Sequence, residues 1–219
     1  MNYQPDQCIV HVVDDDPALR RSLRFLLESV EWKVQLHASA EEFLEAVGQS
    51  RQADQPACVL LDIRMPAMSG LELQQVLQQR GILVPIVFMT GHADVSMAVQ
   101  AMKSGAADFI EKPFKDQVVL DAVAAAMRRS AEALHEQQVR DEAVQVLASL
   151  SPREREVAKL VALGQANKVV AANLGISEKT VHIHRQHVME KAGVSSAAEL
   201  ARLMLRADPA AFEKPMTRV

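Results

Sequence analysis

The sequence is poor in cysteine and has no long apolar segment. Only two cysteines occur in 219 residues, and no apolar run approaches the roughly 20 residues that a membrane-spanning helix needs. Cys8 and Cys58 fall in or beside stretches that we expect to be buried strands, which favours small core residues in a reducing cytosol over a metal or disulfide pair. Residues 1–6 lack the basic region and apolar core of a secretory signal. We therefore expect a cytoplasmic protein that makes no contact with a membrane.

The charges are unevenly distributed along the chain, although its overall composition is ordinary. Hydrophobic residues make up 49% and charged residues 24%, as in soluble globular proteins, and the length allows one large or two small domains. The net charge of −4 combines −5 over residues 1–130 with +1 over residues 131–219, and residues 151–206 alone carry +4. An acidic half and a mildly basic half indicate two domains with different partners.

Five apolar stretches alternate with helical patterns in the first 130 residues. Such alternation predicts repeated βαβ units, and hence a doubly wound α/β fold whose parallel sheet is covered by helices on both faces. The predicted strands span residues 8–13, 32–36, 58–62, 84–89 and 107–111, and the predicted helices span 17–30, 40–48, 69–80, 94–104 and 115–130.

Acidic residues end two of the predicted strands. Asp62 ends one, and Asp14, Asp15 and Asp16 follow another, so adjacent parallel strands would bring them to one edge of the sheet, where such sheets bind ligands. Like charges a few Å apart repel one another unless a cation lies among them, and carboxylate oxygens suit Mg²⁺. A helix N-cap is the alternative for a single Asp. It suits Asp16, which precedes Pro17, but it does not account for the other three together.

Two further polar residues end predicted strands at the same edge. Thr90 follows the fourth strand, and Lys112 follows the fifth and precedes Pro113. Alone, Thr90 would more often be a helix cap, and Lys112 a solvated charge. A lysine before proline is more informative, because its backbone is restricted and its side chain can be aimed. A hydroxyl and an ammonium group are therefore expected to join the carboxylates.

Four motifs in this half resemble those of bacterial two-component receiver domains. They are Val-Val-Asp-Asp-Asp, Leu-Leu-Asp-Ile-Arg-Met-Pro, Met-Thr-Gly and Glu-Lys-Pro-Phe, in this order and spacing. The resemblance covers residues 7–130 and implies a flavodoxin-like fold with five parallel strands in the order 2-1-3-4-5. It also implies that a sensor histidine kinase phosphorylates Asp62 in a reaction that depends on Mg²⁺.

The resemblance assigns a role to each acidic residue of this edge. Asp62 would be the nucleophile, with no general base needed, because a carboxylate is already ionised. Asp15, Asp62 and the backbone carbonyl of Arg64 would hold Mg²⁺. Asp14 would act with Asp15 in an acidic pocket. Phosphoryl transfer depends mainly on positioning and charge neutralisation, which such a site supplies.

The resemblance also implies a switch that responds to the phosphoryl group. Thr90 would hydrogen-bond this group, and Lys112 would pair with it and offset its charge. Phe109 stands where the family often has a switch Tyr. The change to Phe removes any hydroxyl contact and leaves burial of the ring as the switch signal.

The second half of the chain has a helical pattern throughout. Residues 131–149 contain no Gly or Pro, which predicts a helical linker, either one long helix with the preceding segment or two helices joined near residue 130. Ser151, Pro152 and Glu154 then form a helix-start signal with a capping box. Two helices joined by a tight turn at Gly175 follow, as in a helix-turn-helix. A last helix is expected over 197–206, followed by a tail over 207–219.

The second helix of this motif has a face suited to reading DNA. Val181, His184 and Val188 share one side by helical spacing and should point inward. An exposed Ile183 among polar groups can meet a thymine methyl, while Gln186 can read adenine. A simple solvated helix face is the alternative. The predicted contacts to DNA phosphates are made by Lys179, Thr180 and Arg185. The other predicted contacts to DNA are made by His182, Ile183 and Gln186.

Residues 150–206 resemble the LuxR-type DNA-binding domain. The motifs are Ser-Pro-Arg-Glu-Arg-Glu-Val, Asn-Lys and Leu-Gly-Ile-Ser-Glu-Lys-Thr-Val-His-Ile-His-Arg. Joined to a receiver, this domain is similar to response regulators of the NarL/FixJ family, and Gly-His-Ala-Asp-Val after Thr90 is nearer the FixJ branch. His182 departs from the Lys that is common in the family. The resemblance implies that phosphorylation promotes homodimerisation and binding to a double-stranded DNA operator, with RNA polymerase as a further partner.

Two other functions are compatible with parts of the sequence. An Mg²⁺-dependent phosphatase or phosphotransferase could use Asp62, but the chain lacks a second large domain or cap that would form a substrate pocket. We therefore expect no enzyme activity beyond slow autodephosphorylation. A DNA-binding scaffold that is independent of phosphorylation would not need the acidic, hydroxyl and lysine residues at the sheet edge. The sequence thus favours a phosphorylation-controlled transcription factor.

Overall fold

The computed structural model describes residues 7–49, 55–91 and 95–213. The chain divides into two compact units, Met1–His135 and Glu136–Val219. The first unit is an α/β domain and the second is all helical. Within the described part of the chain, none of the helices is both long and apolar enough to cross a membrane.

The first unit is built around a five-stranded sheet in which every neighbouring pair is parallel. The strand order is β2-β1-β3-β4-β5, which confirms the predicted order. The inner strands are continuous apolar runs because helices cover them on both faces, leaving no solvated side. The strands are β1 (Ile9–Val13), β2 (Lys33–His37), β3 (Ala57–Asp62), β4 (Ile86–Thr90) and β5 (Asp108–Glu111).

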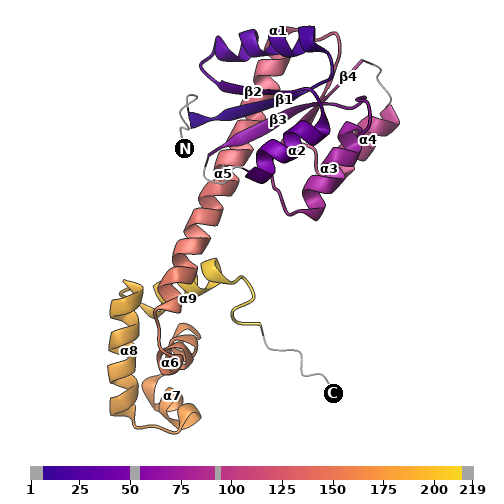
Figure 1. Cartoon of the computed structure of the whole chain (residues 1–219). Coiled ribbons are helices and arrows are strands. Elements are labelled where there is room, and N and C mark those ends of the chain that lie inside the picture. The colour runs from indigo at the N-terminus through magenta and orange to yellow at the C-terminus, as the bar shows by residue number, and fades with distance from the viewer. Residues whose placement is uncertain (1–6, 50–54, 92–94, 214–219) are drawn as a thin grey trace, which may run out of the picture. The chain divides into compact units, whose positions relative to one another are not determined.

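Helices form a layer on each face of this sheet. Side chains of α1 and α5 share one buried cluster with the sheet, and those of α2, α3 and α4 share the other. Figure 1 shows α2 and α3 in front of the strands and α5 behind them. The first four helices begin and end within two residues of the predicted bounds. They are α1 (Pro17–Glu28), α2 (Ala40–Gln49), α3 (Gly70–Gln79) and α4 (Val95–Lys103).

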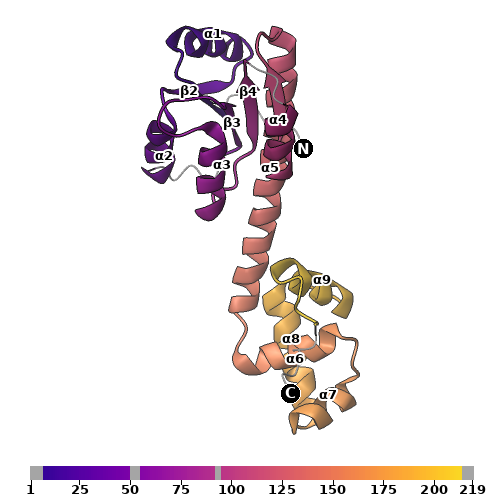
Figure 2. The ribbon, with the colours of Figure 1, turned by 90° about the vertical axis from the view of Figure 1, so that its right-hand side faces the viewer.

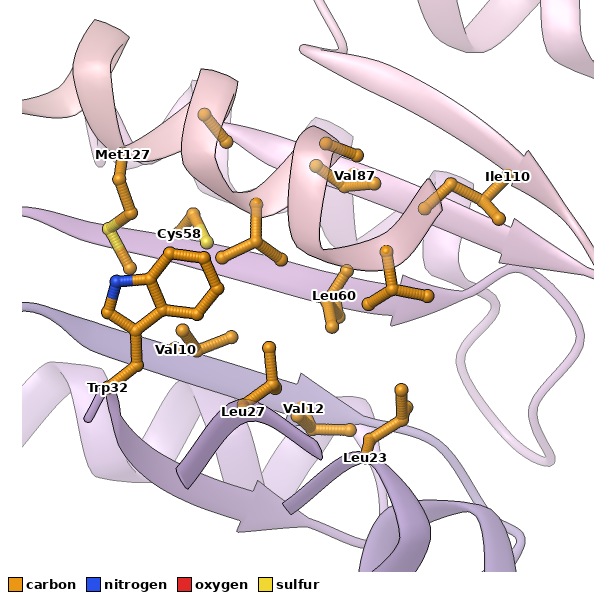
Figure 3. Close-up of a cluster of buried hydrophobic side chains, with 14 of the residues drawn as sticks. Val10, Val12, Leu23, Leu27, Trp32, Cys58, Leu60, Val87, Ile110 and Met127 are labelled. Carbon is orange, nitrogen blue, oxygen red and sulfur yellow. The ribbon is translucent and has the colours of Figure 1, made fainter. Parts of the chain in front are cut away.

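The first cluster encloses the single tryptophan of the protein. Trp32 is 8% exposed, and its indole lies near Met127 and Cys58 (Figure 3). Both cysteines are buried and neither forms a disulfide, and burial raises the pKa of Cys58. A thiol held protonated in an apolar cluster behaves as a small core side chain, as the sequence predicted.

Helix α5 (Asp116–Ala148) is one continuous helix of 33 residues, the first of the two alternatives for the linker (Figure 2). Its first part is fixed to the sheet. Ser130 is buried, and its hydroxyl accepts a hydrogen bond from the backbone N–H of Ala57 at 3.0 Å. The guanidinium of Arg129 donates to the carbonyl of Ala107 at 2.9 Å. These two hydrogen bonds hold the first part of α5 on the sheet.

The second unit is a bundle of four helices with a small apolar core. Gly175 ends α7 with φ +65°, a left-handed conformation that glycine adopts without steric cost, and so forms the tight turn into α8. Ser177 caps α8 by accepting a hydrogen bond from the N–H of Thr180 at 3.1 Å. The helices are α6 (Pro152–Ala162), α7 (Asn167–Leu174), α8 (Glu178–Ala192) and α9 (Ala197–Ala207).

An ion pair between a buried glutamate and a partly exposed lysine ties α6 to α8 within this unit. The carboxylate of Glu154 is 4% exposed and accepts hydrogen bonds from Lys191 Nζ at 2.7 and 3.0 Å. It also accepts the N–H of Ser151 at 2.8 Å, which completes the predicted capping box. The hydrogen bond from Lys191 and that from Ser151 lower the pKa of Glu154 to about 2. The carboxylate thus stays ionised and holds the end of α8 against the start of α6.

Two histidines form a buried hydrogen bond beneath α2. His11 Nδ1 lies 3.1 Å from His37 Nε2, and both rings contact the edge of Phe43. Burial, with a contribution from His37, lowers the pKa of His11 to about 4, and burial also lowers the pKa of His37. One neutral ring must donate to the other, so protonation of both rings would break the pair.

We predict that this pair makes the first unit sensitive to acid. The folded pKa of His11 lies below its unfolded value of 6.5, so the stabilisation is complete above about pH 6.5 and is lost as the pH falls toward 4. The loss for His11 is on the order of 3 kcal/mol in the free energy of unfolding. Urea unfolding followed by fluorescence of Trp32, the single tryptophan, measures this unit alone.

In the double variant His11→Leu/His37→Leu, the free energy of unfolding should depend much less on pH. His135→Leu, at an exposed position on α5, is the matched control and should keep the pH dependence of the wild type. Equal pH dependence in the wild type and the double variant would show that other groups cause the acid sensitivity.

Candidate functional site

Two carboxylates and one ammonium group meet at the C-terminal edge of the sheet. Asp62 is the last residue of β3, Asp14 follows β1, and Lys112 follows β5. Lys112 Nζ donates to Asp14 Oδ2 and to Asp62 Oδ1, at 2.7 Å each. Asp14 and Asp62 are 1% and 6% exposed. Parallel strands that are distant in sequence thus bring together three of the residues that the sequence singled out.

The remaining carboxylate oxygens are held by backbone N–H groups. Asp16 N donates to Asp14 Oδ1 at 2.9 Å, and Arg64 N donates to Asp62 Oδ2 at 3.0 Å. Asp16 also caps α1 by accepting the N–H of Ala18, as predicted. The orientation of both carboxylates is therefore fixed from two sides before any ligand binds.

The electrostatics of the site show a shortage of positive charge. Burial raises the pKa of Asp62, and the hydrogen bond from Lys112 offsets this only in part, while the charge of Asp14 raises it further. Burial lowers the pKa of Lys112, but its hydrogen bonds to Asp14 and Asp62 outweigh burial and raise that pKa. The raised pKa of Asp62 thus comes first from burial, whereas that of Lys112 comes from its two carboxylate partners. An additional cation at this edge would be stabilised.

The residues predicted to hold Mg²⁺ offer oxygen atoms only, which is the donor set that this ion prefers. Asp15 is exposed beside Asp14, and Arg64 is exposed beside Asp62. In residues 7–49, 55–91 and 95–213, no three His, Cys, Asp or Glu side chains already converge as a ligand set. The donor chemistry and the negative excess fit Mg²⁺, and Asp15, Asp62 and the Arg64 carbonyl are the groups that would hold it.

The two predicted switch residues lie on neighbouring strands. Thr90 ends β4 and is 2% exposed, and its carbonyl accepts the N–H of Lys112 at 2.7 Å. Phe109 pairs with Phe88 in the ladder between β4 and β5, and its ring is half-buried against the second core cluster. The ring of Phe109 is therefore partly exposed, so its exposed fraction can either rise or fall.

The outward side of α8 carries the predicted DNA contacts. Val181 and Val188 are buried as predicted, whereas His184 is only half-buried. Ile183 is 44% exposed on this side. Lys179, His182 and Gln186 are exposed around it.

Two of the residues predicted to contact phosphates are already engaged. The hydroxyl of Thr180 lies 2.8 Å from that of Ser177, and Arg185 Nη1 donates to Asn167 Oδ1 at 3.2 Å. Arg185 lines a surface pocket of about 400 Å³ between α7 and α8, whose other lining residues are Asn167, His182, Gln186 and Met189. Asn167 therefore sets the direction of Arg185, a role that the sequence did not reveal.

The structure adds two residues to the sheet edge. The side chain of Arg20 is half-buried, and its guanidinium donates to the carbonyl of Asp14. Gly70 begins α3 directly against the backbone of Asp62. The only sequence signal for Gly70 was its place after the Asp62 motif, and no signal pointed to Arg20.

Two family models together match most of the chain. Residues 10–124 match the response regulator receiver domain, and residues 148–204 match the luxR family of bacterial regulatory proteins.

Relatives and solved structures with both domains are similar along nearly the whole length. The transcriptional regulatory protein FixJ of Azorhizobium caulinodans is 47% identical over 204 residues, which cover 93% of this chain and 94% of that protein. The structure of the response regulator StyR has a TM-score of 0.80 at 42% identity, covering 90% and 98% of the two chains. Full-length FixJ from B. japonicum has a TM-score of 0.56 at 40% identity, covering 91% and 96%. The chain therefore belongs to the FixJ branch of the NarL/FixJ family of two-component response regulators, with a receiver domain and a LuxR-type DNA-binding domain.

Proposed function

We propose that Asp62 accepts a phosphoryl group from a sensor histidine kinase and that this modification controls binding to DNA. The observation that carries the proposal is the buried Asp14–Lys112–Asp62 cluster, in which one ammonium faces the acceptor at 2.7 Å. A structural salt bridge needs one carboxylate for each ammonium. Here the second carboxylate leaves a negative excess that suits a metal-assisted reaction.

The transfer itself requires one nucleophilic oxygen. An oxygen of Asp62 bonds to phosphorus, the bond from phosphorus to the kinase imidazole nitrogen breaks, and the electron pair stays on that nitrogen. Lys112 remains close enough to neutralise an oxygen of the bound phosphoryl group. The N–H of Arg64 keeps the carboxylate in its orientation during the approach. Mg²⁺, bound by Asp15, Asp62 and the Arg64 carbonyl, supplies further charge neutralisation for this transfer.

The modified protein acts on double-stranded DNA as a dimer. Val99 and Met102 of α4 are each 46% exposed, more apolar surface than packing on the sheet requires, and we assign them to a contact between receivers formed by α4 and β5. Val95, expected at the same contact, has a side chain outside the described residues. Thr90 leads from the phosphorylation site toward α4, and Phe109 lies on β5. Burial of the Phe109 ring would shift the equilibrium between two conformations of this α4–β5 surface.

Dimerisation places two α8 helices on half-sites about one turn of DNA apart. Linkage of the two sites raises the joint affinity without any new contact to DNA. Bound near a promoter in the cytoplasm, the dimer would contact RNA polymerase. The protein is thus a regulator rather than an enzyme, and hydrolysis of its own acyl phosphate is at most slow.

The phosphoacceptor is tested with Asp62→Asn, which is nearly isosteric. Incubation with acetyl phosphate and Mg²⁺ should add one phosphoryl group to the wild type and none to this variant, as measured by intact-protein mass spectrometry. Asp121→Asn, at an exposed position on α5, should be labelled like the wild type. Full labelling of Asp62→Asn would identify another acceptor.

The DNA contacts are separated by two variants. Gln186→Ala should lose about 1–3 kcal/mol of discrimination at one base position, because a direct contact to a base edge is removed. Lys179→Ala should weaken binding to all sequences and reduce the salt slope by about one, because a phosphate contact is lost. Selection from a random DNA pool and titrations at several salt concentrations measure the two effects.

Lys33→Ala removes an equally exposed charge from β2 of the receiver and is the control for net charge. A motif selected by Gln186→Ala that matches the wild-type motif would contradict the assignment of the reading face.

The dimer contact is tested by sedimentation of the full-length protein with and without beryllium trifluoride and Mg²⁺. The wild type should dimerise only with the phosphoryl mimic, and Met102→Asp should weaken that dimer at least tenfold, because a charge would enter an apolar contact. Val30→Asp is the control. Val30 is 37% exposed and lies beside β2, at the opposite edge of the sheet from β5. A wild type that stays monomeric under both conditions would contradict the model.

A further inference from the structure

The first residue of α3 lies unusually close to the proposed phosphoacceptor. A Cβ added to Gly70 would lie 2.4 Å from the carbonyl oxygen of Asp62 and 3.1 Å from both Ile63 Cα and Leu61 Cγ. Non-bonded carbon and oxygen atoms rarely approach within about 3.3 Å. The N–H of Gly70 also donates to the carbonyl of Ile63 at 2.9 Å. The start of α3 is therefore docked on the backbone of Asp62, and only glycine allows this approach.

Helix α3 is held firmly on its other sides. Its first turn is fixed by a capping box in which Glu72 accepts the N–H of Ser69 at 2.8 Å and Glu72 N donates to the hydroxyl of Ser69. Leu73 and Leu77 are fully buried in the second core cluster. Gln74 is 3% exposed and donates to the carbonyl of Ser104 at 3.0 Å. A clash at Gly70 would therefore not be relieved easily by a shift of the helix.

Beyond Leu61 the end of β3 is held by one neighbouring strand only, through contacts that include the N–H of Ile63 donating to the carbonyl of Met89 at 3.1 Å. Leu61 is the last residue of β3 that pairs with β1, whereas Asp62 pairs only with Met89 of β4. A methyl group at position 70 would push the carbonyl of Asp62 by roughly 1 Å to reach normal contact. Such a shift moves the carboxylate away from Lys112 and from the N–H of Arg64, which now hold it.

We propose that Gly70 is a positioning residue that fixes the phosphoacceptor through direct contact between the first turn of α3 and the backbone of Asp62. The inference rests on the proposed phosphorylation of Asp62. Gly70 touches neither the donor nor the phosphoryl group, so it acts only on the placement of the acceptor. A misplacement of about 1 Å can slow a reaction by up to about 100-fold.

The test is the rate of phosphorylation of full-length Gly70→Ala by acetyl phosphate with Mg²⁺. The phosphorylated fraction is followed by intact-protein mass at several donor concentrations. We expect the maximal rate to fall tenfold or more, while the donor concentration at half-maximal rate changes little because the donor's own contacts remain. A variant with general structural damage would instead show a reduced helical signal by circular dichroism.

Gly48→Ala is the matched control, because it makes the same substitution in helix α2 where nothing lies within 4 Å of the added Cβ. It should be phosphorylated like the wild type. A Gly70→Ala protein that is folded and labelled at the wild-type rate would show that α3, and not the backbone of Asp62, has moved to accommodate the methyl group. This result would overturn the proposal. Labelling of Asp62→Asn would overturn the proposed function itself, so the two failures are distinguishable.

A second variant covers the case in which Gly70→Ala does not fold. Ser69→Ala/Glu72→Ala removes both side chains of the capping box that holds the first turn of α3, without adding an atom near Asp62. It should lower the maximal rate several-fold and leave the half-saturating donor concentration unchanged. A wild-type maximal rate in this variant contradicts the proposal.

Discussion

One ammonium group shared by two buried carboxylates holds the functional edge of the receiver together. Lys112 reaches Asp14 and Asp62 at 2.7 Å each, across sequence separations of 98 and 50 residues. Buried charges are costly unless they are paired, so this contact requires the C-terminal ends of β1, β3 and β5 to stay in register. The parallel strand order supplies that register. The excess of one carboxylate makes the site suited to a cation, which would in turn offset the charge of a phosphoryl group.

The segment between Asp62 and α3 is constrained by the same edge. Ala67 adopts φ +64°, a left-handed conformation that costs a non-glycine residue about 1–2 kcal/mol. Gly70 then returns the chain to within contact of Asp62. The local strain persists because α3 is fixed by its capping box and its buried leucines. The fold thus stabilises a tight loop that a flexible chain would not form, and the acceptor gains a fixed orientation.

The DNA-binding unit meets a different constraint, because four short helices enclose only a small core. The polar contacts that order α6 and α8 relative to each other include the Glu154–Lys191 pair and the capping residues. This order leaves the outward side of α8 free of intramolecular packing, with Ile183 exposed among polar side chains. An apolar residue that the core does not use is then available to a base methyl group.

The sequence by itself determined the parallel α/β class, the helix starts and the acidic edge, because these follow from local patterns: apolar runs, capping residues and charged residues that end strands. The family motifs then supplied the role expected for each residue. The tertiary structure decided which groups touch. That Lys112 bridges Asp14 and Asp62, that Arg20 turns onto Asp14, and that Asn167 holds Arg185 depends on elements far apart in the chain. It also decided that Gly70 must lack a side chain, since that requirement comes from the backbone of a neighbouring strand and leaves no periodic signal in the sequence.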